Sequence, residues 1–217
     1  MRVIQINSES SWRGGEQQLF NLALGLKEQG VEQLVAARPA SPLGLRMKEA
    51  GIPVLPIEPA YGWDFRTVRI LRGVVREWQP HLLHAHTGHA HTLGWLTARQ
   101  TGTPLVVSRR VDFHRNRNPL SRLKFLSPAV TRYITVSGAI RDILIEDGVD
   151  PRKINVVHSG VDPDRLTGVE PDSDWLRKAG VPEGGILLGN VAALAPHKDQ
   201  ATLIRAMRIV TLAHPDA

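Results

Sequence analysis

The segment Ser11-Trp12-Arg13-Gly14-Gly15-Glu16 joins a short apolar run to an amphipathic one, and this junction decides the fold. The preceding run, residues 2–6 (RVIQI), is apolar and β-branched enough for a buried strand. After the glycines, apolar residues recur at helical spacing until Gly30, which supplies a stop. The sequence therefore predicts a glycine pair at the turn from a first strand into a first helix.

Two interpretations of this glycine pair are open. The first N–H groups of a helix are unpaired and positive, and glycine lets an anionic group approach them because it has no Cβ. Alternatively, Gly14 and Gly15 only make a tight turn. Two glycines do not separate these interpretations, since even a longer glycine fingerprint depends on its structural context.

The composition is that of an ordinary globular protein. The chain has 217 residues, of which 42% are hydrophobic and 22% are charged. It contains no cysteine, which excludes disulfides and thiolate metal sites. No apolar run approaches the roughly 20 residues of a membrane-spanning helix, and no signal peptide is recognisable. We expect a cytoplasmic protein.

The formal net charge of +6 indicates an anionic partner. Nucleic acid, anionic lipid and phosphorylated small molecules are the three classes that such a surface can meet. Aromatic residues make up only 5% of the chain, and no basic-aromatic motif of an RNA-binding sheet is present. We therefore expect no nucleic-acid partner.

Strand-like and helix-like segments alternate through the first 162 residues. The predicted strands are residues 2–6, 31–37, 53–57, 81–85, 104–108, 132–136 and 154–157. Helices are predicted between them, one of them capped by Asp64 and another by Ser137. The strands are too apolar to face water on either side. This pattern predicts an α/β fold with a doubly wound, mostly parallel, Rossmann-like sheet.

The character of the chain changes after residue 162. Proline and glycine punctuate residues 163–185, which we interpret as a linker. A strand at 186–191 and a helix at about 199–213 follow. A lone βα unit cannot close a parallel sheet, so residues 186–217 are predicted to begin a second, truncated domain after a first domain at 1–162. Alternatively, this unit packs on the first sheet as an eighth strand and helix. An unpaired strand edge at 186–191 would favour dimerisation.

Five segments, taken in order, resemble a known family. They are WRGGE at 12–16, LLHAHTGHAHTLGW at 82–95, ITVSGAIRD at 134–142, VVHSGVD at 156–162 and GNVAALAPHKDQATLIRAM at 189–207. Together they resemble the amino-terminal, acceptor-binding domain of GT-B glycosyltransferases of the retaining family 4. The last segment resembles the opening of that family's donor-binding domain.

The resemblance implies roles for particular residues. Gly14 and Gly15 match a glycine loop at the donor phosphates, and Lys198 matches a lysine that holds the donor diphosphate. A cation there suits the negative charge that develops on the leaving diphosphate. The residues expected on the acceptor side of the cleft are Glu16, His86, Arg109, Arg110, Ser137 and Ser159.

The sequence departs from the family pattern in two places. Ala193 stands where an arginine usually precedes the lysine, and Arg109 or Arg110 stands where a histidine often follows the fifth strand. The family's paired glutamates near the donor sugar would lie beyond Ala217, so the catalytic residues are unknown. The resemblance implies a nucleotide-sugar substrate and neither a metal nor another cofactor.

Four histidines, His84, His86, His89 and His91, invite a metal-site interpretation. Zinc needs three or four converging ligands, whereas these side chains run from a strand into a helix and partly diverge. A place in the cleft for His86 and in the sheet for His84 is the preferred interpretation.

A basic cluster around Asp112 is either a solvated loop or a site for an anionic acceptor. Its members are Arg109, Arg110, Arg115, Arg117, Arg122 and Lys124. A phosphorylated lipid or a lipopolysaccharide core would suit the second interpretation. Trp63, Phe113 and Phe125 are candidates for a peripheral contact with the inner face of the membrane, or for the core.

The sequence thus predicts part of a hexosyltransferase that moves a sugar from a nucleotide sugar to a hydroxyl acceptor with retention, in the synthesis of a cell-envelope polysaccharide or lipopolysaccharide. Residues 1–217 alone are expected to be nearly inactive. The alternatives are a nucleotide-sugar epimerase of the same fold and a non-catalytic module that binds sugar or phosphate.

Overall fold

The computed structural model describes residues 1–60, 63–112, 114, 119–161, 163, 167–170, 173–178, 180 and 187–214. The chain forms two compact units, Met1–Val161 and Asp162–Ala217. The first unit contains the sheet and the candidate site.

Seven parallel strands form the sheet of the first unit. They are β1 (Arg2–Ile6), β2 (Glu32–Ala37), β3 (Val54–Pro56), β4 (Leu82–Ala85), β5 (Leu105–Arg109), β6 (Val130–Thr135) and β7 (Ile154–Val156). Their order across the sheet is β3-β2-β1-β4-β5-β6-β7, and every neighbouring pair is parallel. The predicted doubly wound α/β fold is therefore confirmed.

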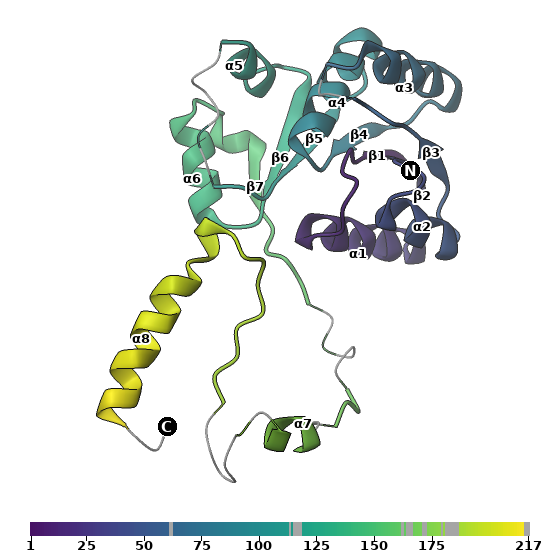
Figure 1. Ribbon diagram of the computed structural model, residues 1–217. Helices are drawn as coiled ribbons and strands as arrows, with labels where there is room; N and C mark the ends of the chain where they lie inside the picture. The colour runs from purple at the N-terminus through teal and green to yellow at the C-terminus, as the bar shows by residue number, and fades with distance from the viewer. Residues whose placement is uncertain are drawn as a thin grey trace. The chain divides into compact units, whose positions relative to one another are not determined.

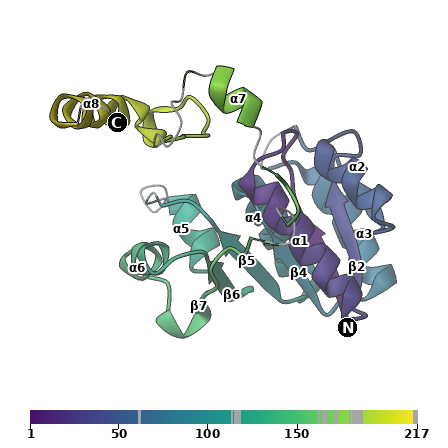
Figure 2. The same cartoon turned by 90° about the horizontal axis from the view of Figure 1, so that it is seen from below.

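Helices cover both faces of this sheet (Figure 1). On one face lie α1 (Gly14–Glu28) and α2 (Pro42–Glu49), and on the other lie α3 (Phe65–Trp78) and α4 (Gly88–Thr101). Figure 2 shows the first of these faces, with α1 in front of the strands. Two shorter helices, α5 (Pro119–Phe125) and α6 (Gly138–Glu146), flank β6, and a 3-10 turn (Pro151–Lys153) precedes β7.

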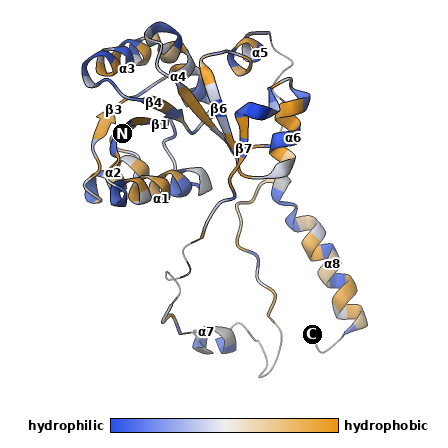
Figure 3. Cartoon of the chain, turned by 180° about the vertical axis from the view of Figure 1, so that it is seen from behind, coloured by the Kyte–Doolittle hydropathy of each residue, from blue (hydrophilic) through white to orange (hydrophobic). Residues whose placement is uncertain are grey.

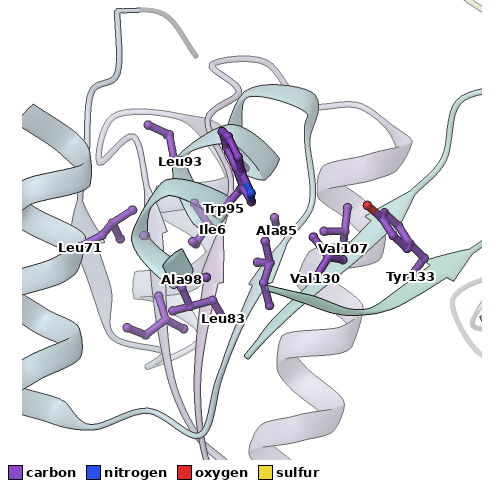
Figure 4. Close-up of a cluster of buried hydrophobic side chains, with 14 of the residues drawn as sticks. Ile6, Leu71, Leu83, Ala85, Leu93, Trp95, Ala98, Val107, Val130 and Tyr133 are labelled. Carbon is purple, nitrogen blue, oxygen red and sulfur yellow. The ribbon is translucent and has the colours of Figure 1, made fainter. Parts of the chain in front are cut away.

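Two apolar clusters hold the layers together. One lies between the sheet and α3 and α4, where Ile6, Leu71, Leu83 and Leu93 are completely buried (Figure 4). The other lies beneath α1 and α2 and includes Leu19, Ala23, Val35, Leu43 and Met47. Each buried leucine contributes about 1.5–3 kcal/mol. Because both faces of the sheet are covered, apolar residues predominate in most of its strands, whereas β6 is more polar (Figure 3).

The helix ends follow the signals in the sequence. Asp64 accepts hydrogen bonds from the N–H groups of Arg66 and Thr67 at the start of α3. Gly30 and Gly102 follow α1 and α4 with φ of 70° and 74°, a conformation in which other residues are strained. The predicted cap Asp64 and the predicted stop Gly30 are therefore confirmed, and Gly102 ends α4 in the same way.

The second unit departs from prediction in one element. It contains α7 (Ser173–Lys178), a 3-10 turn (Pro196–Lys198) and α8 (Gln200–Ala213), so the predicted helix near 199–213 is confirmed. The predicted strand at 186–191 is wrong for its described part, because residues 187–191 form no strand. A β-strand needs a neighbour for its N–H and C=O groups, and these residues, among them the fully exposed Val191, pair with none. The expected dimer-forming edge is thus not formed there. Of the predicted linker, the structure describes residues 163, 167–170, 173–178 and 180, which include α7.

Candidate functional site

The topology of the sheet places a crevice between β1 and β4. The chain leaves β1 for α1 on one face and leaves β4 for α4 on the other, because the strand order reverses at this point. In open parallel sheets such a switch point, at the carboxyl ends of the strands, is where ligands bind. A cavity of about 630 Å³ lies here, lined by Gly15 of α1 and Gly88 of α4 at two helix N-termini.

Five of the residues predicted for the site line this cavity. They are Gly15, Glu16, His86, Arg109 and Arg110. They come from three separate parts of the chain, namely the start of α1, the end of β4 and the end of β5. The topology therefore brings together residues that the sequence could only propose one segment at a time.

The loop between β1 and α1 is fixed by Glu16, which is only 3% exposed. Its Oε1 accepts a hydrogen bond from Asn7 Nδ2 at 3.0 Å, and its Oε2 accepts one from the N–H of Arg13 at 3.1 Å. Both carboxylate oxygens thus bind protein groups, so Glu16 acts as a positioning residue for the loop. Asn7 was not named as a site residue from the sequence, although a polar residue directly after a buried strand is a usable signal.

The glycines at the start of α1 leave an open approach to its N-terminus. Neither Gly14 nor Gly15 has a positive φ, and an added Cβ at either position would meet no atom within 4 Å. Neither backbone conformation nor packing therefore requires glycine here. The first hydrogen bond of the helix runs from Gln17 N to Arg13 O at 3.1 Å, so the earlier N–H groups precede the helical ladder. This geometry favours the anion-approach interpretation over the tight turn.

Two buried histidines lie at the end of β4. The rings of His84 and His86 are 4.0 Å apart between centroids, and His84 Nε2 is 2.9 Å from Ser108 Oγ. His86 Nε2 is 2.7 Å from Gln5 Oε1, which can only accept. Since Arg110 can only donate to Nδ1, the tautomer of His86 that fits both contacts has its proton on Nε2.

Both imidazoles are neutral at neutral pH. Burial lowers the pKa of His84 to about 3, and the charge of Arg110 adds to this effect. Burial also lowers the pKa of His86 well below its ordinary value, with smaller contributions from His84 and Arg110. His86 therefore serves as a neutral hydrogen-bonding group on the cavity wall.

Two consecutive arginines end β5 in different surroundings. Arg109 is 6% exposed, and its Cζ lies 5.4 Å from the centre of the Phe125 ring. Arg110 is half-buried and contacts the carbonyl oxygen and Nδ1 of His86, each at 3.5 Å. Burial lowers the pKa of Arg110, and the Glu16 carboxylate opposes that shift. Arg110 nevertheless remains charged at neutral pH, because the ordinary pKa of an arginine is far above 7.

The remaining predicted site residues lie elsewhere. Ser137 Oγ accepts a hydrogen bond from Ile140 N at 3.3 Å and caps α6. Ser159 lines a different cavity, of about 330 Å³, together with His84 and Arg110. Lys198 belongs to the second unit, so its role at the donor diphosphate stays a prediction.

Thr87 is a further residue that sequence reasoning missed. Its Oγ1 accepts a hydrogen bond from Ala90 N at 3.2 Å and so caps α4. The same hydroxyl is 2.8 Å from Ser8 Oγ, which ties the loop after β1 to the loop after β4. A threonine directly before Gly88 was a usable cap signal in the sequence.

The structure also bears on the metal and membrane interpretations. Within the ranges that it describes, no three His, Asp or Glu side chains are grouped to hold a metal ion. Phe125 is 5% exposed and its ring is parallel to that of Tyr133, so of the two interpretations left open for it, a membrane contact or the core, the core is confirmed. Phe113, Arg115 and Arg117 lie outside the described residues. No described helix has the length and hydrophobicity to cross a bilayer.

Comparison with known proteins places this geometry in context. The model of Glycosyltransferase Family 4 matches residues 12–165. No curated protein sequence matches the chain.

Solved structures share the fold at low sequence identity. Anabaena Alr3699/HepE in complex with UDP-glucose has a TM-score of 0.73 and 20% identity, over 95% of this chain and 57% of its own. The lipopolysaccharide outer core galactosyltransferase WaaB, in its apo form, has a TM-score of 0.57 and 13% identity, over 80% and 50% of the two chains. UDP-N-acetylglucosamine 2-epimerase from Rickettsia bellii has a TM-score of 0.56 and 14% identity, over 84% and 52%. The chain thus spans about half the length of these proteins.

Proposed function

The chain belongs to Glycosyltransferase Family 4, and from this premise we propose that it is the acceptor-binding part of a glycosyltransferase. The enzyme transfers a hexosyl group from a nucleotide sugar to an acceptor hydroxyl and retains the anomeric configuration. The complex of HepE with UDP-glucose supports a nucleotide sugar as the donor.

One observation carries this proposal, namely the cavity at the switch point of the sheet. It opens beside the N-termini of α1 and α4, and Gly15 leaves the first of them unobstructed. Helix N-termini stabilise negative charge through their dipoles and unpaired N–H groups. Negative charge develops on the diphosphate as it leaves the sugar, so this arrangement suits the reaction.

The residues of this chain orient the substrates. Glu16 holds the loop before α1 through Asn7 and Arg13, and His86 contacts Arg110 at the cavity wall. Lys198 is proposed to bind the donor diphosphate from the second unit, without a metal ion. Because the chain spans about half of its structural relatives, residues 1–217 alone are expected to transfer sugar poorly.

The acceptor is proposed to belong to cell-envelope polysaccharide or lipopolysaccharide synthesis. The fold shared with the lipopolysaccharide galactosyltransferase WaaB supports this role. Such an acceptor would place the enzyme in the cytoplasm, at the inner face of the membrane.

A second candidate is a nucleotide-sugar epimerase. The fold shared with the epimerase from Rickettsia bellii favours it. An epimerase would convert the nucleotide sugar without any acceptor, whereas a transferase releases the nucleotide diphosphate only when an acceptor is present.

The test uses the natural gene product, which is first isolated and whose intact mass is then measured. It is incubated with UDP-sugars, with and without a membrane extract as the source of acceptor, and the products are separated by mass. Release of UDP that depends on the extract supports the transferase. An epimerised UDP-sugar without extract supports the epimerase, and binding without turnover of any nucleotide sugar overturns both.

A further inference from the structure

The charged groups of the switch-point cavity are predominantly cationic. Arg13, Arg109, Arg110 and Lys124 line it, whereas Glu9 and Glu16 are its only acidic side chains among the described residues. Both oxygens of Glu16 are already occupied by Asn7 and Arg13 N. Four cationic side chains thus accompany two carboxylates, so the described lining of the cavity carries a net positive charge.

Arg110 is the cation whose surroundings point to a missing anion. Its described hydrogen bonds are two long contacts to His86, at 3.5 Å each, and its Nε is buried with no hydrogen-bond partner in the described part of the chain. It forms no ion pair with a described residue. A half-buried guanidinium without an anion is costly, because its charge has lost water without gaining a partner.

The Glu16 carboxylate acts on Arg110 without forming an ion pair with it, and the described groups in contact with Arg110 carry no negative charge. His86 and His84 beside it are neutral, and Ser108 already pairs with His84. Nearby on the same cavity, His91 is 2% exposed and its Nε2 has no partner among the described residues. The N-terminus of α4, at Gly88 and His89, adds a positive dipole end. These groups favour a negatively charged ligand over a neutral one.

We propose that the cavity binds a phosphoryl group of the acceptor and that Arg110 is the residue that selects it. A guanidinium presents parallel N–H donors that match two phosphate oxygens, which a point charge cannot do. This inference rests on the proposed function, since it names the acceptor class of the same site. The phosphoryl group belongs either to a small phosphorylated sugar or to a lipid headgroup, and both sources present the same chemistry.

The substitution Arg110→Gln tests this assignment. Glucose 6-phosphate and glucose are titrated into the 217-residue chain by calorimetry, because the two probes differ only in the phosphoryl group. We expect the chain to prefer glucose 6-phosphate, and Arg110→Gln to weaken its binding about tenfold or more. Arg110→Lys should restore part of the affinity, since it keeps the charge but loses the fork.

The matched control is Arg76→Gln, which removes the same charge from an exposed position on α3. It should leave binding of glucose 6-phosphate unchanged. Equal weakening by both substitutions would show a nonspecific effect of net charge and overturn the proposal. Thermal unfolding checks that each variant folds. If Arg110→Gln does not fold, the binding of glucose 6-phosphate by Arg110→Lys serves as the test.

Two further arms separate the sources of the phosphoryl group. Binding is measured to vesicles of phosphatidylcholine with and without phosphatidic acid. Binding that depends on Arg110 in either the sugar or the vesicle arm supports the proposal and identifies the source. The proposal is overturned if Arg110→Gln changes binding in neither arm. It is also overturned if the substitution weakens the binding of UDP and of no other probe. Transfer of sugar to a neutral acceptor that is insensitive to Arg110→Gln would overturn this inference and leave the proposed function intact.

Discussion

The charged groups on the two sides of the cavity differ in how well they are hydrogen-bonded. On the β1 side, the carboxylate of Glu16 is completely engaged by Asn7 and by the Arg13 amide. On the β4–β5 side, the guanidinium of Arg110 makes two long contacts among the described residues, one to the carbonyl oxygen of His86 and one to its neutral imidazole. A charged group held by two close hydrogen bonds stabilises the fold, whereas a charged group with only long contacts is available to a ligand.

This difference separates structural charge from functional charge within one site. Glu16 and Arg110 are both conspicuous in the sequence, and both line the same cavity. Only their partners distinguish them. Removal of the Glu16 carboxylate should therefore act on stability, and removal of the Arg110 guanidinium should act on binding.

Acidification should produce the largest effect, and it acts on the β4 side. The pKa of His84 is lowered to about 3, and those of His86 and His91 are also well below their ordinary value. Between about pH 6.5 and pH 3 the unfolded chain therefore binds more protons than the folded chain, so stability falls as pH falls. The slope should reach about 1.4 kcal/mol per pH unit for each histidine. Urea unfolding from about pH 7 to about pH 5 measures it.

Replacement of one histidine tests this explanation. His91→Phe removes a titrating group and keeps a ring against Phe125, 4.9 Å away between centroids. The slope of stability against pH should fall by about one third, because three histidines contribute in the same way. A slope equal to that of the wild type would contradict the assignment. The free energy of unfolding at about pH 8, where the three rings are neutral in both states, controls for packing.

Removal of the carboxylate on the β1 side should have the next largest effect. Glu16→Ala leaves Asn7 Nδ2 and Arg13 N without their acceptor, at a cost of about 1–3 kcal/mol in the free energy of unfolding. Glu28→Ala, an exposed position on the same helix, is the matched control and should change stability by less than about 0.5 kcal/mol. Equal losses in the two variants, measured by urea unfolding, would show that Glu16 does not hold the loop.

Much of the first unit was predictable because local signals agree with the global fold. The strand runs are apolar since both faces of the sheet are covered, and Asp64, Ser137 and Gly102 mark helix ends by their chemistry. The strand at 186–191 failed for the opposite reason. Apolar composition alone does not make a strand, and the described residues offer no partner for its backbone.

The site itself was only partly predictable. Five of the residues that line the cavity were named from the sequence, but the pairing that assigns their roles depends on contacts between distant segments. Glu16 meets Asn7, and Arg110 meets His86, through the fold rather than through sequence spacing. Which of two adjacent arginines faces the buried aromatic ring and which faces His86 likewise required the orientation of β5.

The smallest expected effect on stability comes from Gly15→Ala, and its sign sharpens the comparison. An added Cβ at Gly15 meets no atom within 4 Å and the φ there is not positive, so alanine fits the helix. The free energy of unfolding should rise by about 0.4–1 kcal/mol, because alanine restricts the unfolded chain. The matched variant is Gly25→Ala in the same helix, which also meets open space.

The two variants should differ only where a ligand approaches. If the start of α1 receives a phosphate, the methyl group of Gly15→Ala blocks that approach, and UDP-sugar binding or turnover by the natural gene product falls while stability rises. Gly25→Ala lies away from the cavity and should raise stability alone. Unchanged binding and turnover in Gly15→Ala would show that the glycine serves neither turn, packing nor ligand. Gly15→Ala should raise the free energy of unfolding, whereas Glu16→Ala should lower it. If Gly15→Ala also weakens binding, then two neighbouring residues of one loop have different roles: Glu16 holds the loop, and Gly15 leaves room for the ligand.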